Sequence, residues 1–399
     1  MQQQRHKRKS TIADGRDTKR FWGLLNFEKL IAFLYWVYYL LSSKPVFRTY
    51  KGGHKGIFNI GLDNFKVGLL SDWASATDVS QKAANQLGTK DCSVTIHMGD
   101  IYYVGHKEEI LENFCPEKGD WNYGSLGSLA IPGNHEYFSD AKGFYDVLLP
   151  LMGIMQNNIH LQQESGFFCL ENEFWRIIAL DTGYHSVKDS IIKLTLWQDA
   201  HLDKKLIQWL KETVQIEKDH RGIIIVTHHQ PKSGFEEIYP RITEQLTEII
   251  GTSRKVLWFW GHEHRLAFFG VDAKKDQLKA FGRCIGHGGM PVVIGKNDQK
   301  FLPNENAAEQ SLVAYDERDN NIYGTEFQLT SKMLGFNGYA TLTLDRQKLC
   351  VEYFDIENND PLVRENWEVD LSNGALTGSI IENKPGILKL YRSVNLEQA

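Results

Sequence analysis

The chain has 399 residues and a net charge of −5, with 42% hydrophobic and 24% charged residues. This composition is typical of a globular protein with a sizeable core and excludes a collagen-like or intrinsically disordered chain. The acidic balance argues against a nucleic-acid partner, because proteins that bind the phosphate backbone are usually basic. Five cysteines without a Cys-x-x-Cys pair indicate neither a disulfide framework nor a thiolate zinc site, so we predict a reducing, cytoplasmic location.

The N-terminal segment combines a basic arm with an apolar run. Residues 1–20 hold seven Lys or Arg against two Asp, and residues 30–41 are unbroken apolar sequence. That run is shorter than the roughly 20 residues of a membrane-spanning helix. Two interpretations stay open: residues 21–43 form an interfacial helix that contacts a membrane surface, or a helix that packs against protein. We treat residues 1–62 as one unit and keep membrane association as an alternative.

From residue 63 onward, short β-branched runs alternate with amphipathic runs. Strand-like runs cover residues 66–70, 93–97, 128–131, 167–170, 175–180, 222–226, 256–260, 266–271, 339–344, 349–354 and 387–391. Helix-like runs cover residues 79–87, 107–114, 141–149, 202–217 and 241–250. Such alternation with apolar strands is typical of sheets covered by helices. We predict a catalytic domain over residues 63–360, a polar surface insertion near 296–336, and a C-terminal tail over 361–399.

Polar side chains follow five of the predicted strands. They are Asp72 in Leu-Leu-Ser-Asp-Trp, Asp100 and Tyr103 in Gly-Asp-Ile-Tyr-Tyr, Asn134 and His135 in Gly-Asn-His-Glu, His228 and His229 in Val-Thr-His-His-Gln-Pro, and His262 and His264 in Gly-His-Glu-His. Taken singly, each motif fits a turn or a helix cap. Together they place oxygen and nitrogen donors suited to Fe, Mn or Zn where α/β sheets bind ligands, at the carboxyl ends of strands. Seven such donors are enough for two cations that share one ligand.

The order Asp, Gly-Asp, Gly-Asn-His-Glu, His-x-Pro and Gly-His-x-His resembles the calcineurin-like metallophosphoesterase superfamily over about residues 65–290. The resemblance implies an α/β (α+β) four-layer sandwich, with two face-to-face mixed sheets flanked by helices and a dinuclear metal centre at the sheet edge. It assigns Asp72 and His264 to the first metal and Asp100 as the bridge. Asn134, His229 and His262 would bind the second metal.

The first motif departs from the usual pattern of that superfamily. Ala74 stands where most members have a histidine ligand. Asp-Trp followed by Gly-Asp-x-x-Tyr resembles the purple acid phosphatases, whose tyrosine binds a ferric ion. We therefore expect Tyr103 to replace the missing ligand, with Tyr102 as the alternative if the loop register differs. In the His-x-Pro motif we expect His229 as the ligand, and His228 either to support the ligands from behind or to face the substrate.

The expected activity is hydrolysis of a phosphate mono- or diester. A metal-bridging hydroxide would attack phosphorus, and His135 would protonate the leaving group as general acid. A non-catalytic scaffold with the same fold and a membrane-associated lipid phosphoesterase are the alternatives. A phosphate-ester substrate and two metal ions of Fe, Mn or Zn type are implied, while the sequence does not identify the substrate, the metal pair or the oligomeric state.

Overall fold

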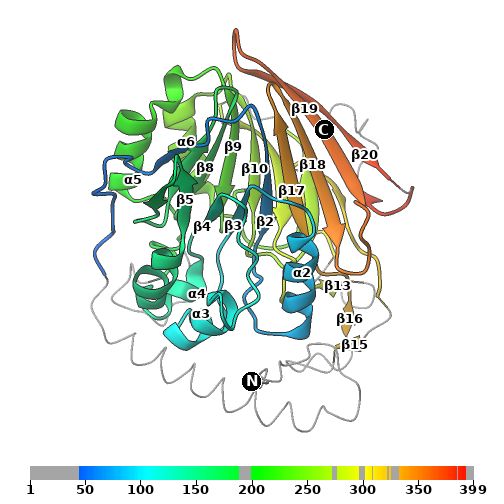
Figure 1. Ribbon diagram of the computed structural model, residues 1–399. Coiled ribbons are helices and arrows are strands. Elements are labelled where there is room, and N and C mark those ends of the chain that lie inside the picture. The colour runs from blue at the N-terminus through cyan, green and yellow to red at the C-terminus, as the bar shows by residue number, and fades with distance from the viewer. Residues whose placement is uncertain are drawn as a thin grey trace.

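The computed structural model describes residues 45–187, 199–271, 276–295, 302–307, 309–320, 323–324, 332–383 and 385–391. These residues form two nine-stranded mixed sheets that lie face to face, together with a small three-stranded sheet (Figure 1). Helices cover the outer faces of the sandwich. The predicted fold, two mixed sheets flanked by helices, is therefore confirmed.

The two large sheets are built from different strands of the chain. The first contains, in spatial order, β1 (Ile57–Asn59), β7 (Phe168–Glu171), β8 (Trp175–Leu180), β9 (Gly222–Thr227), β10 (Lys255–Trp260), β12 (Lys279–Ile285), β11 (Leu266–Phe269), β14 (Leu312–Tyr315) and β21 (Lys389–Leu390). The second contains β20 (Ala375–Glu382), β19 (Val363–Asp370), β18 (Lys348–Asp355), β17 (Gly338–Asp345), β2 (Asn64–Leu70), β3 (Val94–His97), β4 (Gly127–Ala130), β5 (Gly153–Gln156) and β6 (Ile159–Gln162). The small sheet contains β13 (Val293–Ile294), β16 (Lys332–Leu334) and β15 (Tyr323–Gly324).

The centre of each large sheet is parallel. Strands β2, β3 and β4 run parallel in the second sheet, and β8, β9, β10 and β12 run parallel in the first. Parallel strands bring their carboxyl ends to one edge of a sheet, which is where such sheets bind ligands. The polar motifs of the sequence follow these parallel strands.

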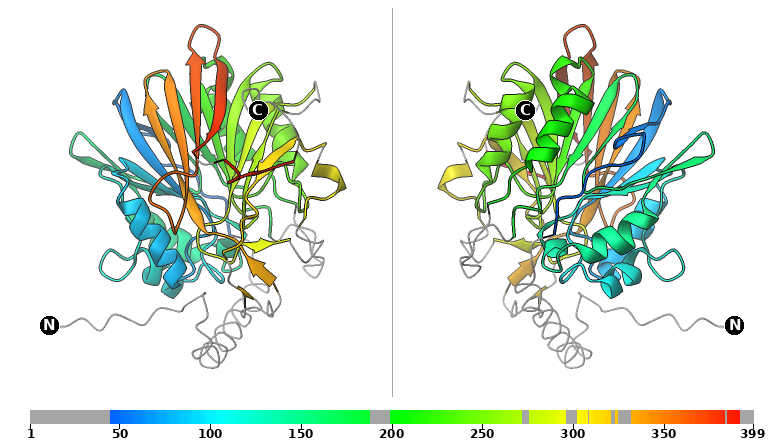
Figure 2. Two further views of the ribbon diagram at one scale, coloured as in Figure 1. Left: turned by 90° about the vertical axis from the view of Figure 1, so that its right-hand side faces the viewer. Right: turned by 90° about the vertical axis from the view of Figure 1, so that its left-hand side faces the viewer.

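The helices lie on the two outer faces (Figure 2). They are α2 (Asp78–Gly88), α3 (Lys107–Phe114), α4 (Asn134–Tyr137), α5 (Lys204–Trp209) and α6 (Pro240–Ile250), with single helical turns at Phe144–Leu148, Leu149–Leu151, Leu210–Val214, Ile216–Lys218 and Glu305–Ala307. Buried residues of α5 and α6 pack in one apolar cluster with the outer face of the first sheet, and those of α2 and α3 pack with the outer face of the second.

Strand β9 shows why these strands are apolar throughout. Its residues alternate between the two faces, so Ile224 and Val226 join the core between the sheets, whereas Ile223 and Ile225 pack beneath the helices. All four are buried. A strand covered on both faces gains from apolar side chains at every position, about 25 cal/mol per Å² of apolar surface removed from water.

The expected domain borders shift at both ends. Residues 57–59 form β1, which pairs with β7, so part of the unit expected over residues 1–62 belongs to the sandwich. Part of the expected C-terminal tail does too, because β19 and β20 extend the second sheet and β21 borders the first. The expected helix within residues 21–43 lies outside the described residues.

The segment 296–336, expected as an irregular surface insertion, is described only in part. Its described portion supplies β14, whose residues are buried in the first sheet and pair with β11. Strands β15 and β16 of the same segment form the small sheet with β13. Among the residues that the structure describes, no helix has the length and apolar character needed to cross a bilayer.

Candidate metal centre

The candidate site follows the carboxyl ends of six strands, and within each sheet these ends are aligned. Leu70, His97 and Ala130 are aligned neighbours at the ends of β2, β3 and β4. In the other sheet, Leu180, Thr227 and Trp260 are aligned in the same way at the ends of β8, β9 and β10. The residues that follow these six strand ends therefore leave the sandwich at one edge.

The backbone at this edge adopts conformations that few residues tolerate. Asp72, Asp100 and His262 have φ values of 53°, 67° and 65°, in the left-handed region. Residues other than glycine rarely occupy this region, and such positions gather at functional sites. The glycine before Asn134 is needed for space, since a Cβ on Gly133 would collide with Asp100 Oδ1.

Four side chains form a first group around one point. The Tyr102 hydroxyl lies 3.0 Å from Asp72 Oδ1, 3.2 Å from Asp100 Oδ2 and 3.0 Å from His264 Nε2. His264 Nε2 also lies 3.4 Å from Asp72 Oδ1. Burial raises the pKa of Tyr102, and the neighbouring Asp72 and Asp100 carboxylates raise it further. A cation among these oxygens would offset that cost and favour the phenolate.

The tyrosine of this group is Tyr102, so the structure places the alternative residue and not Tyr103 beside Asp72. The local backbone explains the register. The Tyr102 amide donates to Ala74 O at 3.0 Å, which lays this residue beside the Asp72 loop. The Tyr103 amide instead donates to the Glu109 carboxylate, and the Tyr103 carbonyl oxygen faces His135.

Asn134, His229 and His262 form a second group with open ligand atoms. Asn134 Oδ1, His229 Nε2 and His262 Nδ1 are buried and have no hydrogen-bond partner within the described part of the chain. Leaving buried polar atoms unpaired costs roughly 1–3 kcal/mol each, and such atoms are rare in folded proteins unless a ligand or ion satisfies them. The donor set, an amide oxygen and two imidazole nitrogens, suits Zn, Mn or Fe.

The protonation states of these two histidines also suit a metal. Burial lowers the pKa of His262 to about 4, with a further contribution from His228. Burial likewise holds the pKa of His229 well below its usual range. Both rings are therefore neutral at pH 7, the form that binds cations. His229 Nδ1 lies 2.9 Å from Thr182 Oγ1, which orients the ring so that Nε2 faces the site.

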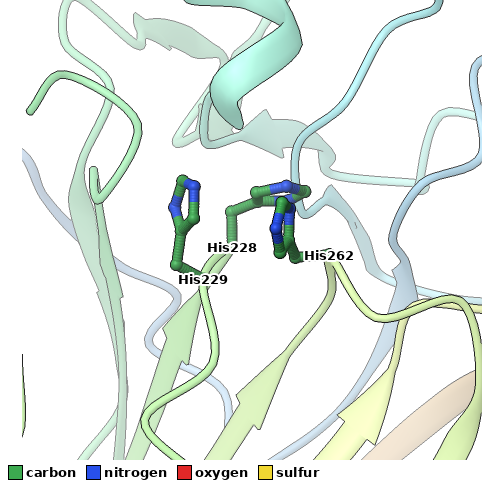
Figure 3. A group of neighbouring side chains, drawn as sticks. All are labelled: His228, His229 and His262. Atoms are coloured by element: carbon green, nitrogen blue, oxygen red, sulfur yellow. The ribbon is translucent and has the colours of Figure 1, made fainter. Parts of the chain in front are cut away.

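His228 lies beside His229 and His262 (Figure 3), and it also belongs to a cluster of ligand atoms with Asp72 and Asp100. Its Nδ1 lies 2.9 Å from the Met98 carbonyl oxygen and its Nε2 lies 3.2 Å from Asp100 Oδ1. The side chain is fully buried. Burial tends to lower the pKa of His228, but Asp100 outweighs it and raises the pKa to about 10. Of the two expected roles, this buried position fits a residue that holds Asp100 rather than one that faces the substrate.

His228 is common to the two clusters of ligand atoms. Nitrogen and oxygen atoms of Asp72, Asp100 and His228 lie within 4.8 Å of one another, and the nitrogens of His228, His229 and His262 do the same. Burial tends to raise the pKa of Asp100, but His135 and His228 hold it well below its usual range. Asp100 is therefore a carboxylate at neutral pH, with Oδ2 beside the Tyr102 hydroxyl and Oδ1 beside His228 Nε2.

His135 stands at the partly open side of the centre. Its side chain is 23% exposed, and Nε2 lies 3.8 Å from Asp100 Oδ2. Nδ1 lies 2.6 Å from the Tyr103 carbonyl oxygen. A carbonyl can only accept, so Nδ1 carries the proton and Nε2 faces the site.

Three further residues support the centre and are not among the predicted site residues. Thr182 holds His229. Glu136 accepts hydrogen bonds from the amides of Asp100 and Gly133. Glu109 accepts from the loop that follows Asp100. Only Glu136 carried a signal, its place in Gly-Asn-His-Glu, because the others reach the centre through contacts distant in sequence or through backbone atoms.

Comparison with known families identifies the class. A model of the family described as calcineurin-like phosphoesterase matches residues 65–266, which is half of the chain. The chain therefore belongs to the calcineurin-like phosphoesterase family. This agrees with the superfamily resemblance seen in the sequence, and no curated protein matches the chain.

Several solved structures are similar at low identity. A purple acid phosphatase, PPD1, from yellow lupin (Lupinus luteus) seeds is 12% identical with a TM-score of 0.47, and the match covers 75% of this chain and 52% of that one. PhoD is 10% identical with a TM-score of 0.48, covering 84% and 73%. A dimetal phosphatase from Danio rerio is 11% identical with a TM-score of 0.43, covering 73% and 96%. The chain thus spans about half the length of the lupin phosphatase.

Proposed function

We propose that this protein is a metal-dependent phosphoesterase with a dinuclear centre built on Asp100. In this proposal Asp72, Tyr102 and His264 hold the first cation, Asn134, His229 and His262 hold the second, and Asp100 contacts both. The observation that carries the proposal is the set of three buried, unpartnered ligand atoms on Asn134, His229 and His262 beside two buried carboxylates.

A tyrosine in the first group supports a centre of the purple acid phosphatase kind. In this proposal its hydroxyl, which lies 3.0 Å from both Asp72 Oδ1 and His264 Nε2, would supply the ligand that Ala74 lacks. Only the lupin structure among those described above is named as a purple acid phosphatase. The native metal pair remains of Fe, Mn or Zn type.

Two bound cations would supply a nucleophilic water near neutral pH and would neutralise charge on the phosphoryl group. The chain's own residues perform the remaining tasks. Asp100 stays ionised beside His135 and His228, and in this proposal its carboxylate would contact both cations. In its imidazolium form, His135 presents Nε2–H at the open side, where it can deliver that proton to the leaving alkoxide while Nδ1 keeps its own.

The scaffold alternative is disfavoured by the site itself. A non-catalytic relative has no need to retain both carboxylates, the unpartnered ligand atoms and an oriented His135 at the same edge. The lipid phosphoesterase alternative depends on membrane contact through residues 21–43, and we keep it as a second proposal to be tested by vesicle binding.

The experiment is a substrate panel on the purified full-length protein, reconstituted in turn with iron, manganese and zinc. Phosphomonoesters, phosphodiesters, nucleotides and phospholipids would be compared at equal protein concentration. Metal-dependent release of phosphate or alcohol from at least one class is the expected result. No turnover of any class with any of the three metals, in protein that binds two ions per chain, would favour the scaffold.

A further inference from the structure

Glu109 lies on helix α3, away from the family motifs, yet its carboxylate binds the loop that carries Tyr102 and Tyr103. It accepts a hydrogen bond from the Tyr103 amide, a second from the Val104 amide at 3.2 Å and a third from the His106 amide at 2.8 Å. Three amides of one four-residue stretch thus converge on a single side chain. Hydrogen bonds from backbone N–H groups to an ionised carboxylate are among the stronger ones in proteins.

This loop in turn controls His135. The carbonyl oxygen of Tyr103 lies 2.6 Å from His135 Nδ1. The ring of His135 also packs at 4.5 Å from the Tyr102 ring and 4.9 Å from the Phe138 ring, measured between centroids, tilted by 60° and 58°. Those ring contacts restrict the plane of the imidazole, but neither of them decides which nitrogen carries the proton. The Tyr103 carbonyl oxygen keeps a proton on Nδ1, since it can accept a hydrogen bond only from a protonated nitrogen.

We infer that Glu109 is a positioning residue for the general acid: it fixes the Tyr103–Val104 peptide, whose carbonyl oxygen accepts from His135 Nδ1–H, so that the Nε2–H of the imidazolium form points at the leaving group. Transfer of the Nε2 proton to the leaving alkoxide then leaves the neutral ring with its remaining proton on Nδ1. The inference rests on the proposed function, in which His135 protonates the leaving alkoxide. Its structural core, the Glu109–Tyr103–His135 connection, stands on the observed contacts alone. A general acid held in one orientation loses less in reaching the transition state.

The test compares Glu109→Ala and Glu109→Gln with Glu112→Gln, a matched control. Glu112 is an exposed residue of the same helix, so its substitution removes the same charge without touching the loop. For an alkyl phosphate with a poor leaving group, Glu109→Ala should lower kcat about 10- to 100-fold. For nitrophenyl phosphate, which needs little protonation, the loss should stay within about threefold. Glu109→Gln, which keeps one acceptor oxygen, should fall between the wild type and Glu109→Ala.

A double-mutant comparison separates positioning from general destabilisation. In a His135→Ala background, Glu109→Ala should cause no further loss of kcat, because the residue through which it acts is gone. Metal content should stay at the wild-type level throughout. Equal losses for both substrates, or a full additional loss in the His135→Ala background, would overturn the inference. If Glu109→Ala does not fold, Glu109→Gln carries the same comparison.

The tautomer of His135 gives a readout that needs no turnover. Nitrogen NMR of the zinc-loaded protein should show His135 protonated at Nδ1 in the wild type and in Glu112→Gln, and a mixture of tautomers in the Glu109 variants. An unchanged tautomer would contradict the inference even if the protein hydrolyses esters. A lack of any hydrolysis with the expected NMR change would instead contradict the proposed function.

Discussion

Replacing Tyr102 by Phe removes one oxygen from the first ligand group and leaves the ring in place. The lost hydroxyl lies 3.0–3.2 Å from Asp72, Asp100 and His264, so a cation held by those three residues would lose its fourth protein ligand. Removing even an outer partner of a metal ligand costs about 10- to 100-fold in affinity. We therefore expect a loss of at least about 100-fold at the first site, equivalent to about 2.8 kcal/mol.

The matched control is Tyr103→Phe, which removes the same atom one residue later. Tyr103 meets the site through its backbone carbonyl, which this substitution preserves, so affinity should change by no more than about twofold. Metal affinity would be measured by competition with a coloured chelator, and metal content by elemental analysis. If the bound ion is ferric, a visible charge-transfer band should disappear in Tyr102→Phe and persist in Tyr103→Phe. The opposite pattern would refute the loop register, and no effect of either change would refute a tyrosine ligand.

Three further changes probe other parts of the site. His135→Ala should leave metal content near normal and lower kcat by about 10²- to 10⁴-fold, with a smaller loss for nitrophenyl phosphate; equal losses for all esters would argue that His135 binds phosphate instead. Thr182→Val should weaken metal binding about 10- to 100-fold, because it removes the hydrogen-bond partner of His229 Nδ1. Metal titration should show no such loss for the control Thr377→Val, which changes an exposed threonine of β20. Deletion of residues 1–44 should retain turnover, since every proposed ligand lies later in the chain. If residues 21–43 contact membranes, the deletion should abolish flotation of the protein with anionic vesicles. Unchanged flotation would reject that contact.

Most of the sandwich could be predicted because its strands are short apolar runs with clear ends. The expected runs at 175–180 and 256–260 reappear almost unchanged as β8 and β10. The ligands after them could be placed at one edge because parallel strands end together. The same reasoning places Asp72, Asp100, Asn134, His229, His262 and His264 at that edge, and their roles as metal ligands stay a prediction.

Strand β19 shows why the C-terminal strands of the second sheet could not be predicted from the sequence. Its inward residues are Val363, Glu365, Trp367 and Val369, so a charged residue interrupts the apolar alternation. Glu365 is fully buried and pairs with Arg283 of β12 at 2.6 Å. In the sequence alone, a glutamate is typical of an exposed position, because its buried partner lies far away in the chain. The sequence therefore predicts a tail here.

The choice between Tyr102 and Tyr103 could not be made from spacing either. It depends on the course of a loop that is fixed by the hydrogen bond from the Tyr102 amide to Ala74 O and by the hydrogen bonds from loop amides to Glu109. These hydrogen bonds all involve backbone amides, which leave no periodic signal in the sequence. The burial of His228 likewise depends on Met98 O and Asp100, in the loop that follows β3 of the facing sheet.

Metal stoichiometry and turnover, measured together on wild type and Asp100→Asn, test the dinuclear phosphoesterase most directly. Asp100 is one of two buried carboxylates in the centre and the one proposed to contact both cations. Wild-type protein stripped with chelator should be inactive and should regain phosphoester hydrolysis as two ions bind per chain. Asp100→Asn should bind fewer than two ions and show no turnover above background. An Asp100→Asn protein that binds two ions and keeps more than a few per cent of wild-type activity would contradict the assignment.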